Sequence, residues 1–323
     1  MTERRAGSAG RVTSFIAALT VMVVVAACSG SGTTSSGAKP SGSAGGGTKR
    51  IVFAAVPAGE ASTFQAHFGM FVRALSEETG LEIKTFQAAD YAGVIEALIA
   101  GTVDVAQLGA FSYALAVQNG AKIEPVGLLQ HRKGDKPGYS VLGVARSNAA
   151  VSSIADFRGK TVCFPDPAST STLIPLFEFA KAGLVPDKDF KRIIVPAGNT
   201  IPRTIKQGDC DVGLVADAQL ENAIRTGDVR KDELKTFWEV RAPHSPLVMR
   251  TALSQDARNA IRAATLKINA DYLAARGWCK GDDCLISSNR DYGYLPVNHS
   301  YYQVIWDACK ATHIDACAAI GAS

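Results

Sequence analysis

The stretch DYAGVIEALIAGTVDVAQLGA, residues 90–110, decides the fold class expected for this chain. Asp90 can cap a helix, apolar residues recur through the segment that follows, and Gly101 is placed to end that helix. The apolar run after Gly101 predicts a strand. The same order, a helix, a glycine and Asp-Val before an apolar run, returns in RTIKQGDCDVGLVA at residues 203–216. Any α/β unit can give such a repeat. We interpret it here as a sign of two similar α/β domains.

Strands and helices alternate along the rest of the chain. The expected strands are residues 49–57, 81–88, 102–110, 122–130, 139–147, 160–164, 190–198 and 210–217. The expected helices are residues 62–79, 91–101, 111–119, 169–183, 200–208, 219–226, 256–276 and 301–311, with one extended segment at 234–250. This order predicts α/β sheets that are mostly parallel and carry helices on both faces.

The chain is expected to pass between the two domains twice, near residues 140–146 and 240–247. Two α/β domains connected in this way are typical of a bilobed binding protein. We therefore expect residues 49–142 and 246–323 to form lobe 1, and residues 143–245 to form lobe 2.

Residues 1–27 have the pattern of an export signal, with arginines before a short apolar run. This run ends in VVVAAC, residues 23–28, where an aliphatic residue and two alanines precede a cysteine. That order is typical of a lipoprotein signal, so we expect lipid on Cys28; an ordinary signal peptide and an uncleaved anchor are the alternatives. Residues 28–48 are nearly all Gly, Ser and Thr and are expected to form a flexible tether. The sequence therefore predicts a protein anchored to the outer face of the cytoplasmic membrane.

The charge of the chain argues against a nucleic-acid ligand. The formal net charge is +4, and the export signal contains three arginines and one glutamate, so the rest is close to neutral. No basic run follows the tether. About 270 residues remain after the tether, which suits two domains of ordinary size or one large domain.

The chain has seven cysteines. If Cys28 carries lipid, six remain, and an even number in an exported protein predicts disulfides. The sequence alone does not select a pairing, but one pairing joins two expected strands and closes two short loops: Cys163–Cys210, Cys279–Cys284 and Cys309–Cys317. Zinc is the competing interpretation, but paired C-x-x-C knuckles and a histidine cluster are missing, so we expect no metal.

The segment DPASTST, residues 166–172, places four hydroxyl side chains at the expected start of a helix. One such side chain is enough to cap a helix, so the others need a further explanation. A helix N-terminus offers free N–H groups and a positive dipole end, and so binds anions. The segment follows a strand, and ligands of open α/β sheets bind beyond the carboxyl ends of strands. We therefore predict an anion site here, with capping as the alternative.

No catalytic constellation accompanies this segment. Only His244 among the five histidines lies near an expected crossing, and the sequence has no G-x-S-x-G elbow and no phosphate loop with a lysine. The sequence therefore favours a binding protein over an enzyme, with no cofactor. An exported hydrolase built on Ser169 or Ser171 and a sensor that signals to a membrane kinase are the alternatives.

Three segments, residues 89–116, 137–172 and 207–215, resemble the phosphonate-binding proteins of ABC importers. The blocks D-Y-x-x-x-I-E-A-L and D-P-x-S-T-S and their separation carry this resemblance, which covers roughly residues 50–250. It implies a type II periplasmic-binding-protein fold, in which two α/β lobes joined by a two-stranded hinge close on the ligand. It also implies an ABC permease and its ATPase as partners, and we expect a monomer.

The resemblance further implies a ligand site. The residues that match the family's phosphonate ligands are Tyr91, Tyr139, Ser169, Thr170 and Ser171. In this pattern the Ser-Thr-Ser hydroxyls and the N–H groups behind them hold the phosphonate oxygens, and the two tyrosines donate from the opposite lobe. A tyrosine packed at a helix start or half-buried in a strand is the alternative for each of them.

This chain departs from the family in two places. Where relatives often have a histidine, it has Asn199, whose amide can donate to an oxyanion but carries no charge. Relatives that bind aminoalkyl phosphonates hold the ammonium group with carboxylate side chains. In this chain the positions that match those carboxylates are Ala218 and Ser245, and Asp217 lies one residue away. An ammonium without a carboxylate partner is costly in a closed cleft. We therefore predict a small ligand with an uncharged tail: phosphite, a short alkylphosphonate or phosphate.

A weaker set of residues could form the wall of the pocket. Core packing or capping is at least as good an interpretation for several of them. The set is Phe111, Tyr113, Thr172, Asp217 and Ser245.

Overall fold

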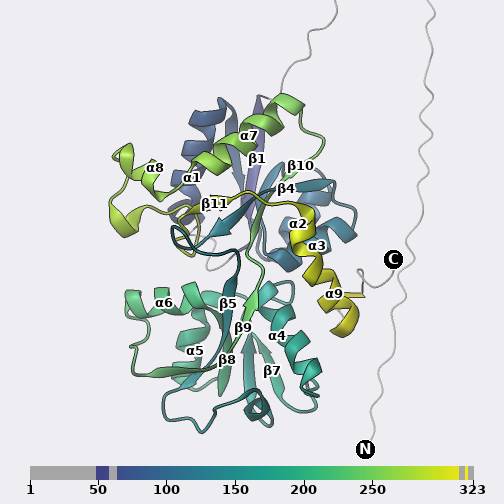
Figure 1. Ribbon diagram of the computed structural model, residues 1–323, viewed down its shortest axis with the longest axis vertical. Coiled ribbons are helices and arrows are strands. Elements are labelled where there is room, and N and C mark those ends of the chain that lie inside the picture. The colour runs from purple at the N-terminus through teal and green to yellow at the C-terminus, as the bar shows by residue number, and fades with distance from the viewer. Residues whose placement is uncertain (1–48, 58–63, 313–316, 319–323) are drawn as a thin grey trace, which may run out of the picture. The chain divides into compact units, whose positions relative to one another are not determined.

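The computed structural model describes residues 49–57, 64–312 and 317–318, and its strands form two sheets (Figure 1). The first sheet has six strands: β1 (Arg50–Ala55), β2 (Glu82–Phe86), β3 (Val105–Gln107), β4 (Ile123–Gln130), β10 (Pro246–Arg250) and β11 (Gly293–Leu295). The second sheet has five strands: β5 (Tyr139–Arg146), β6 (Thr161–Phe164), β7 (Lys191–Ile194), β8 (Val212–Ala216) and β9 (Leu234–Ala242). The expected export signal, Cys28 and tether lie outside the described residues.

In each sheet three parallel strands form one side and antiparallel pairs form the other. The first sheet has the order β11-β4-β10-β3-β1-β2, in which β1 pairs in parallel with β2 and β3. The second has the order β7-β6-β8-β5-β9, in which β6 pairs in parallel with β7 and β8. The predicted α/β class is therefore confirmed, but the prediction of mostly parallel sheets is wrong, because five of the nine strand pairings are antiparallel and four are parallel. The carboxyl ends of the parallel strands form an edge where a ligand can bind.

Helices cover both faces of each sheet (Figure 1). The helices are α1 (Phe64–Thr79), α2 (Tyr91–Ile99), α3 (Ala110–Gln118), α4 (Thr170–Lys181), α5 (Ile201–Gln207), α6 (Asp217–Thr226), α7 (Gln255–Lys267), α8 (Ala270–Ala275) and α9 (Gln303–Thr312). Helices α2 and α3 pack on one face of the first sheet, and α1 and α7 on the other. Helix α9 packs against both α3 and α4, so the chain after β11 bridges helices from the two sheets. No helix among the described residues is long and apolar enough to cross a membrane.

The stretch at residues 90–110 folds as its residues predict. The Asp90 side chain accepts a hydrogen bond from the N–H of Gly93 at 2.9 Å and so caps α2. Gly101 has φ +74°, a left-handed conformation that favours glycine after a helix. The strand, Val105–Gln107, is shorter than expected at its end because Gly109 already caps the next helix, α3. Before the strand, the Asp104 carboxylate accepts from the N–H of Val52 at 2.9 Å.

Several expected boundaries need correction. The whole of β5 pairs with β8 and β9, so the first connection between the sheets is residues 131–138 and not 140–146. The segment expected at 234–250 is two strands, because Pro243 to Ser245 lead the chain back to the first sheet. The single helix expected at 256–276 is two helices, because the Asn269 side chain caps α8 by accepting from Tyr272 N–H. The sequence analysis missed β11.

Three disulfides cross-link segments of the described chain. They have the pairing that the sequence analysis favoured: Cys163–Cys210, Cys279–Cys284 and Cys309–Cys317. The first joins β6 to the residue pair that leads into β8, and so links neighbouring parallel strands. Disulfides of this kind are typical of exported proteins.

Candidate functional site

A central cavity of about 80 Å³ lies between the two sheets. Its walls come from the carboxyl ends of β1, β3 and β8, from the starts of α2, α4 and α6, and from a loop at residues 287–291. The cavity therefore lies where the sheet topology predicts a ligand. Its volume suits a small ligand.

Four helices direct their N-termini at the central cavity. The residues of these N-termini that line it are Tyr91 of α2, Gly109 before α3, Ser169 to Ser171 of α4 and Asp217 to Gln219 of α6. No lysine or arginine of the described chain lines the cavity. An anion in the cavity would therefore be stabilised by helix dipoles and neutral N–H and O–H donors.

The hydroxyl groups at the start of α4 have different partners. Ser169 caps the helix, because its Oγ accepts from the N–H of Ser171 at 3.2 Å. Thr170 Oγ1 accepts from the N–H of Phe111 at 3.0 Å and so joins the start of α4 to the start of α3 on the other sheet. Thr172 donates to the carbonyl oxygen of Asp166 at 2.9 Å and points away from the cavity. One hydroxyl is thus the cap, one bridges the sheets, and Ser171 lies against Tyr139.

The two tyrosines enter the cavity from different sheets. Tyr91 begins α2, which packs on the first sheet. Tyr139 lies on β5 of the second sheet, the sheet whose strand β6 leads into α4. The expectation that both donate from the opposite lobe is therefore wrong for Tyr139, because its strand pairs along its length with β8 and β9. The Tyr139 hydroxyl lies 2.9 Å from Ser171 Oγ. Burial raises the pKa of both hydroxyls far above the usual value, so both stay protonated and able to donate.

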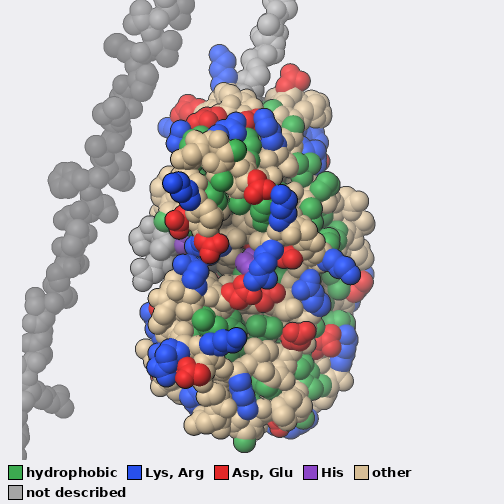
Figure 2. All heavy atoms as spheres, turned by 60° about the vertical axis from the view of Figure 1, so that its left-hand side comes forward, with side chains coloured by type: hydrophobic (Ala, Val, Ile, Leu, Met, Phe, Trp, Pro, Cys, Tyr) green, Lys and Arg blue, Asp and Glu red, His purple; other side chains and the backbone are tan. Residues whose placement is uncertain are grey.

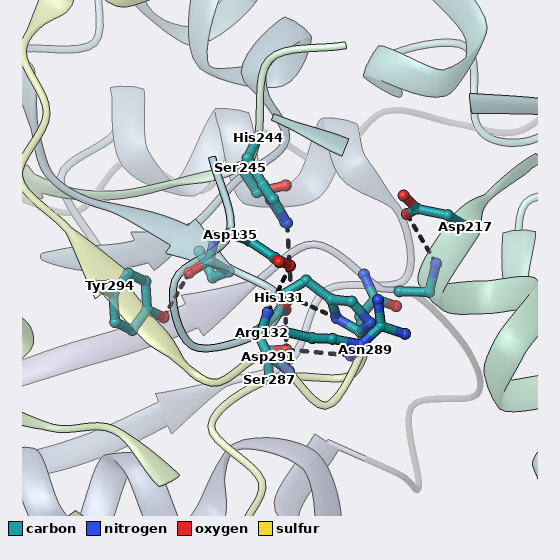
Figure 3. Close-up of polar contacts among 12 residues, drawn as sticks. His131, Arg132, Asp135, Asp217, His244, Ser245, Ser287, Asn289, Asp291 and Tyr294 are labelled. Carbon is teal, nitrogen blue, oxygen red and sulfur yellow. Dashed lines mark hydrogen bonds and ion pairs between the residues drawn. The ribbon is translucent and has the colours of Figure 1, made fainter. Parts of the chain in front are cut away.

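Two carboxylates line the central cavity, and both are engaged within the protein (Figure 3). Asp217 accepts from the N–H groups of Ser140 and Ala218, at 2.9 and 2.8 Å. Asp291 accepts from the hydroxyl of Ser287. Both oxygens of Asp217 thus already accept a hydrogen bond, whereas Asp291 Oδ1 is buried without a hydrogen-bond partner among the described residues.

Asp291 lies between two histidines, which point toward it in Figure 3. Its Oδ1 is 3.4 Å from His131 Nδ1 and 3.6 Å from His244 Nε2. Contact with Asp291 raises the pKa of His131, and burial lowers the pKa of His244. Burial opposes ionisation of Asp291, but the two histidines and Ser287 outweigh it and lower its pKa. The cluster therefore holds a buried carboxylate in the cavity wall, with its charge balanced by His131.

Most of the predicted site residues meet at the central cavity. Those that line it are Tyr91, Tyr139, Ser169, Thr170, Ser171, Asp217 and Ser245. Those that do not are Phe111, Tyr113, Thr172 and Asn199. Phe111 is completely buried in the core, and Tyr113, a residue 1% exposed, bonds through its hydroxyl to His299 Nδ1 at 2.8 Å. Asn199 lies in the turn after β7, where its Oδ1 is buried without a partner among the described residues.

The sequence analysis missed part of the lining. Gln107, His244, Ser287, Asn289 and Asp291 also line the cavity. Gln107 had a sequence signal, because it is a polar residue inside an otherwise apolar strand. Its side chain donates to the carbonyl oxygen of Pro246 at 3.0 Å and accepts from the Tyr294 hydroxyl at 2.7 Å. In the part of the chain that the structure describes, no group of three or more His, Cys, Asp or Glu could hold a metal.

The geometry describes a binding protein of the type II periplasmic-binding-protein fold, and comparison with known proteins agrees. Residues 53–302 match the family of periplasmic substrate-binding proteins of phosphonate ABC transporters. The chain therefore belongs to that family, whose members are transport proteins and not enzymes. Membership implies an extracytoplasmic location, with an ABC permease and its ATPase as partners.

Individual relatives agree with this assignment. The chain is 34% identical to the phosphate-import protein PhnD of Mycolicibacterium smegmatis, over 93% of this chain and 96% of that protein. It is 26% identical to the phosphonates-binding periplasmic protein of Escherichia coli, over 59% of this chain and 58% of that one. Among solved structures, PhnD1 of Prochlorococcus marinus in complex with methylphosphonate has a TM-score of 0.70 at 17% identity, over 82% of this chain and 99% of that one. A binding protein of an ABC phosphonate transporter from Pseudomonas aeruginosa has a TM-score of 0.68 at 24% identity, over 82% and 88% of the two chains.

Proposed function

We propose that this protein captures a small phosphorus oxyanion, phosphate, phosphite or a short alkylphosphonate, in the central cavity and delivers it to the permease. The observation that carries the proposal is the convergence of four helix N-termini on a cavity whose described lining contains no lysine or arginine. Several neutral donors are needed for the three oxygens of one phosphorus group. Relatives named for phosphate import and in complex with methylphosphonate support this ligand class.

The proposed ligand residues are those at the starts of α2 and α4 together with one strand residue. They are Tyr91, Tyr139, Ser169, Thr170 and Ser171. In the first turn of α4, the N–H of Ser171 donates to Ser169 Oγ at 3.2 Å and the N–H of Thr172 donates to the carbonyl oxygen of Ser169 at 3.0 Å. These short contacts replace the missing acceptors four residues back, so the N–H groups of Thr170 and Ser171 would turn to the oxyanion when it binds. The tyrosine hydroxyls, kept protonated by burial, would donate from two sides.

The carboxylates in the cavity support a ligand without an ammonium group. Asp217 already accepts from two backbone N–H groups, and Asp291 is held by Ser287 between two histidines. Residues 218 and 245, alanine and serine, offer no further carboxylate. A buried ammonium would lack a dedicated partner, at a cost of several kcal/mol.

We further propose that the two sheets define two lobes that close on the ligand about the connections at residues 131–138 and 243–245. The hydrogen bond from Phe111 N–H to Thr170 Oγ1 would join the lobes in the closed form. Lipid on Cys28 would anchor a monomer to the outer face of the cytoplasmic membrane, with residues 28–48 as the tether.

A thermal-shift titration tests the ligand class. The purified protein would be titrated with phosphate, phosphite, methylphosphonate, 2-aminoethylphosphonate and sulfate. We expect at least one of the three ammonium-free phosphorus anions to raise the melting temperature, and Ser171→Ala to reduce that shift. Tighter binding of 2-aminoethylphosphonate than of methylphosphonate would refute the assignment of the tail, and no shift with any of them would refute the proposed ligand class.

A further inference from the structure

A second cavity, of about 350 Å³, adjoins the central cavity and is lined by basic side chains. We call it the basic chamber; its charged lining residues are Arg132, Lys133, Arg225, Arg290, Glu221 and Asp282. It lies between α6 of the second sheet and the loop before β11 of the first. Figure 2, which shows the side of the molecule bearing α6 and α8, has lysine and arginine side chains beside acidic ones around a histidine at mid-height. Asp271, which is not part of the lining, pairs with Lys133, so the charged groups at the chamber leave a small positive charge.

The basic chamber and the central cavity are neighbours, because Ala218 and Asn289 line both. Ala218 matches the position at which aminoalkyl-binding relatives are expected to carry a carboxylate. In this chain Ala218 contributes a methyl group to the boundary and Asn289 a neutral amide, so neither of the two shared residues places a charge between the two spaces. A ligand with its phosphorus group in the central cavity could therefore extend past Ala218 into the chamber.

Among the described residues, Arg290 is the chamber cation whose side chain makes no hydrogen bond or ion pair. Arg132 bonds to Glu221, Lys133 lies 2.8 Å from Asp271, and Arg225 donates to Asn222 at 2.6 Å. The Nη2 atom of Arg290 is buried and has no hydrogen-bond partner among the described residues. A partly buried guanidinium without an acceptor is costly, and a carboxylate is the acceptor that fits its planar fork.

The backbone holds Arg290 in place. Its φ is +60°, a left-handed conformation that is uncommon for a residue other than glycine. The hydroxyl of Ser287 accepts from the N–H groups of Asn289 and Asp291, at 3.1 and 3.3 Å, on either side of it. The loop is thus fixed with Asn289 at the boundary of the two cavities and Arg290 in the chamber.

We propose that the basic chamber is a second anion subsite, in which Arg290 binds the carboxylate of a carboxyalkyl phosphonate whose phosphorus group occupies the central cavity. This inference rests on the proposed function and extends it. The protein would bind phosphonates with an acidic tail as well as the small anions that have no tail. Arg132 and Lys133 are balanced by the carboxylates to which they bond. Arg225 bonds to the neutral side chain of Asn222 and so supplies further positive potential.

Isothermal titration of the purified protein with methylphosphonate, phosphonoacetate, 3-phosphonopropionate and 2-aminoethylphosphonate tests the subsite. We expect at least one carboxylate ligand to bind about tenfold or more tightly than methylphosphonate, the gain expected from a charge-assisted hydrogen bond. Arg290→Gln should abolish that gain and leave the affinity for methylphosphonate within about twofold. Arg290→Lys, which keeps the charge, should keep part of the gain, and Arg192→Gln on β7, away from both cavities, should change neither affinity.

Two results would overturn the subsite while the proposed function stands. One is equal affinity for methylphosphonate and every carboxylate ligand. The other is a parallel loss of affinity for methylphosphonate and the carboxylate ligands in Arg290→Gln, which would make the chamber a general attractor of anions. If methylphosphonate, the carboxylate ligands, phosphate and phosphite all fail to bind, the proposed function fails and the subsite fails with it.

Discussion

Removal of the Tyr139 hydroxyl is the sharpest perturbation of the proposed site. The Tyr139→Phe variant keeps the aromatic ring, whose centroid lies 5.2 Å from that of His244, and removes only the oxygen that lies 2.9 Å from Ser171 Oγ. A hydrogen bond to a charged group contributes about 1.5–3 kcal/mol. Loss of that bond to the bound oxyanion should therefore raise Kd by about 10- to 150-fold.

The same loss can be measured as a change in ligand-induced stability. At a concentration of about 100 times the wild-type Kd, ligand adds about 2.7 kcal/mol to the free energy of unfolding. With Kd raised by the expected factor, the ligand should add only about 0.3–1.4 kcal/mol to the variant at that concentration. Chemical denaturation with and without methylphosphonate gives both quantities.

Tyr113→Phe is the matched control. The Tyr113 hydroxyl is buried and bonds to His299, but it does not line the central cavity. Both variants should lose about 1 kcal/mol of stability without ligand, because each loses one internal hydrogen bond. Only Tyr139→Phe should lose affinity; an unchanged Kd in that variant, or an equal change in the control, would refute the proposed role of Tyr139.

Three further predictions concern the fold around the site. Gly109→Ala places a methyl group 3.3 Å from Thr170 Oγ1. Calorimetry should therefore show weaker ligand binding, and denaturation should show that the free energy of unfolding falls by about 1 kcal/mol. Unchanged values would show that α3 and α4 can separate without cost. The double variant Cys163→Ser, Cys210→Ser opens a loop with a sequence separation of 47 residues. Denaturant titration should show that its free energy of unfolding is lower by about 4 kcal/mol. A loss below about 1 kcal/mol would contradict this expectation. The raised pKa of His131 means that protonation stabilises the fold below the unfolded pKa and that this gain disappears as pH rises through the folded pKa. His131→Asn should therefore cost more stability near pH 5.5 than near pH 8.5, and an equal cost at both would exclude a charged His131.

Local patterns predicted most of the fold. Asp90 and Gly101 mark the ends of α2 by their own chemistry, and apolar runs in parallel strands identify β1, β3, β6 and β8. The boundaries that were wrong depend on distant partners. Tyr139 belongs to the second sheet because it pairs with Ala242 of β9. Strand β11 forms because β4 leaves an edge with which it can pair.

The candidate site was predictable where it lies on one segment. The hydroxyl cluster at Ser169 to Ser171 and the helix start at Tyr91 carry local signals of an anion site. Asp291 and Arg290 carry none, because their position beside the cavity depends on how the chain after α8 returns to the first sheet. The excess of hydroxyls also has a structural share that the sequence could not reveal, since Thr170 Oγ1 bonds across to Phe111.

The most direct test of the central claim is a crystal structure of the protein with bound methylphosphonate. The account predicts one ligand in the central cavity, with its phosphorus oxygens within hydrogen-bonding distance of the first-turn N–H groups of α4 and of the Tyr91 and Tyr139 hydroxyls. A phosphorus group bound instead among the arginines of the basic chamber, with the start of α4 unoccupied, would contradict it.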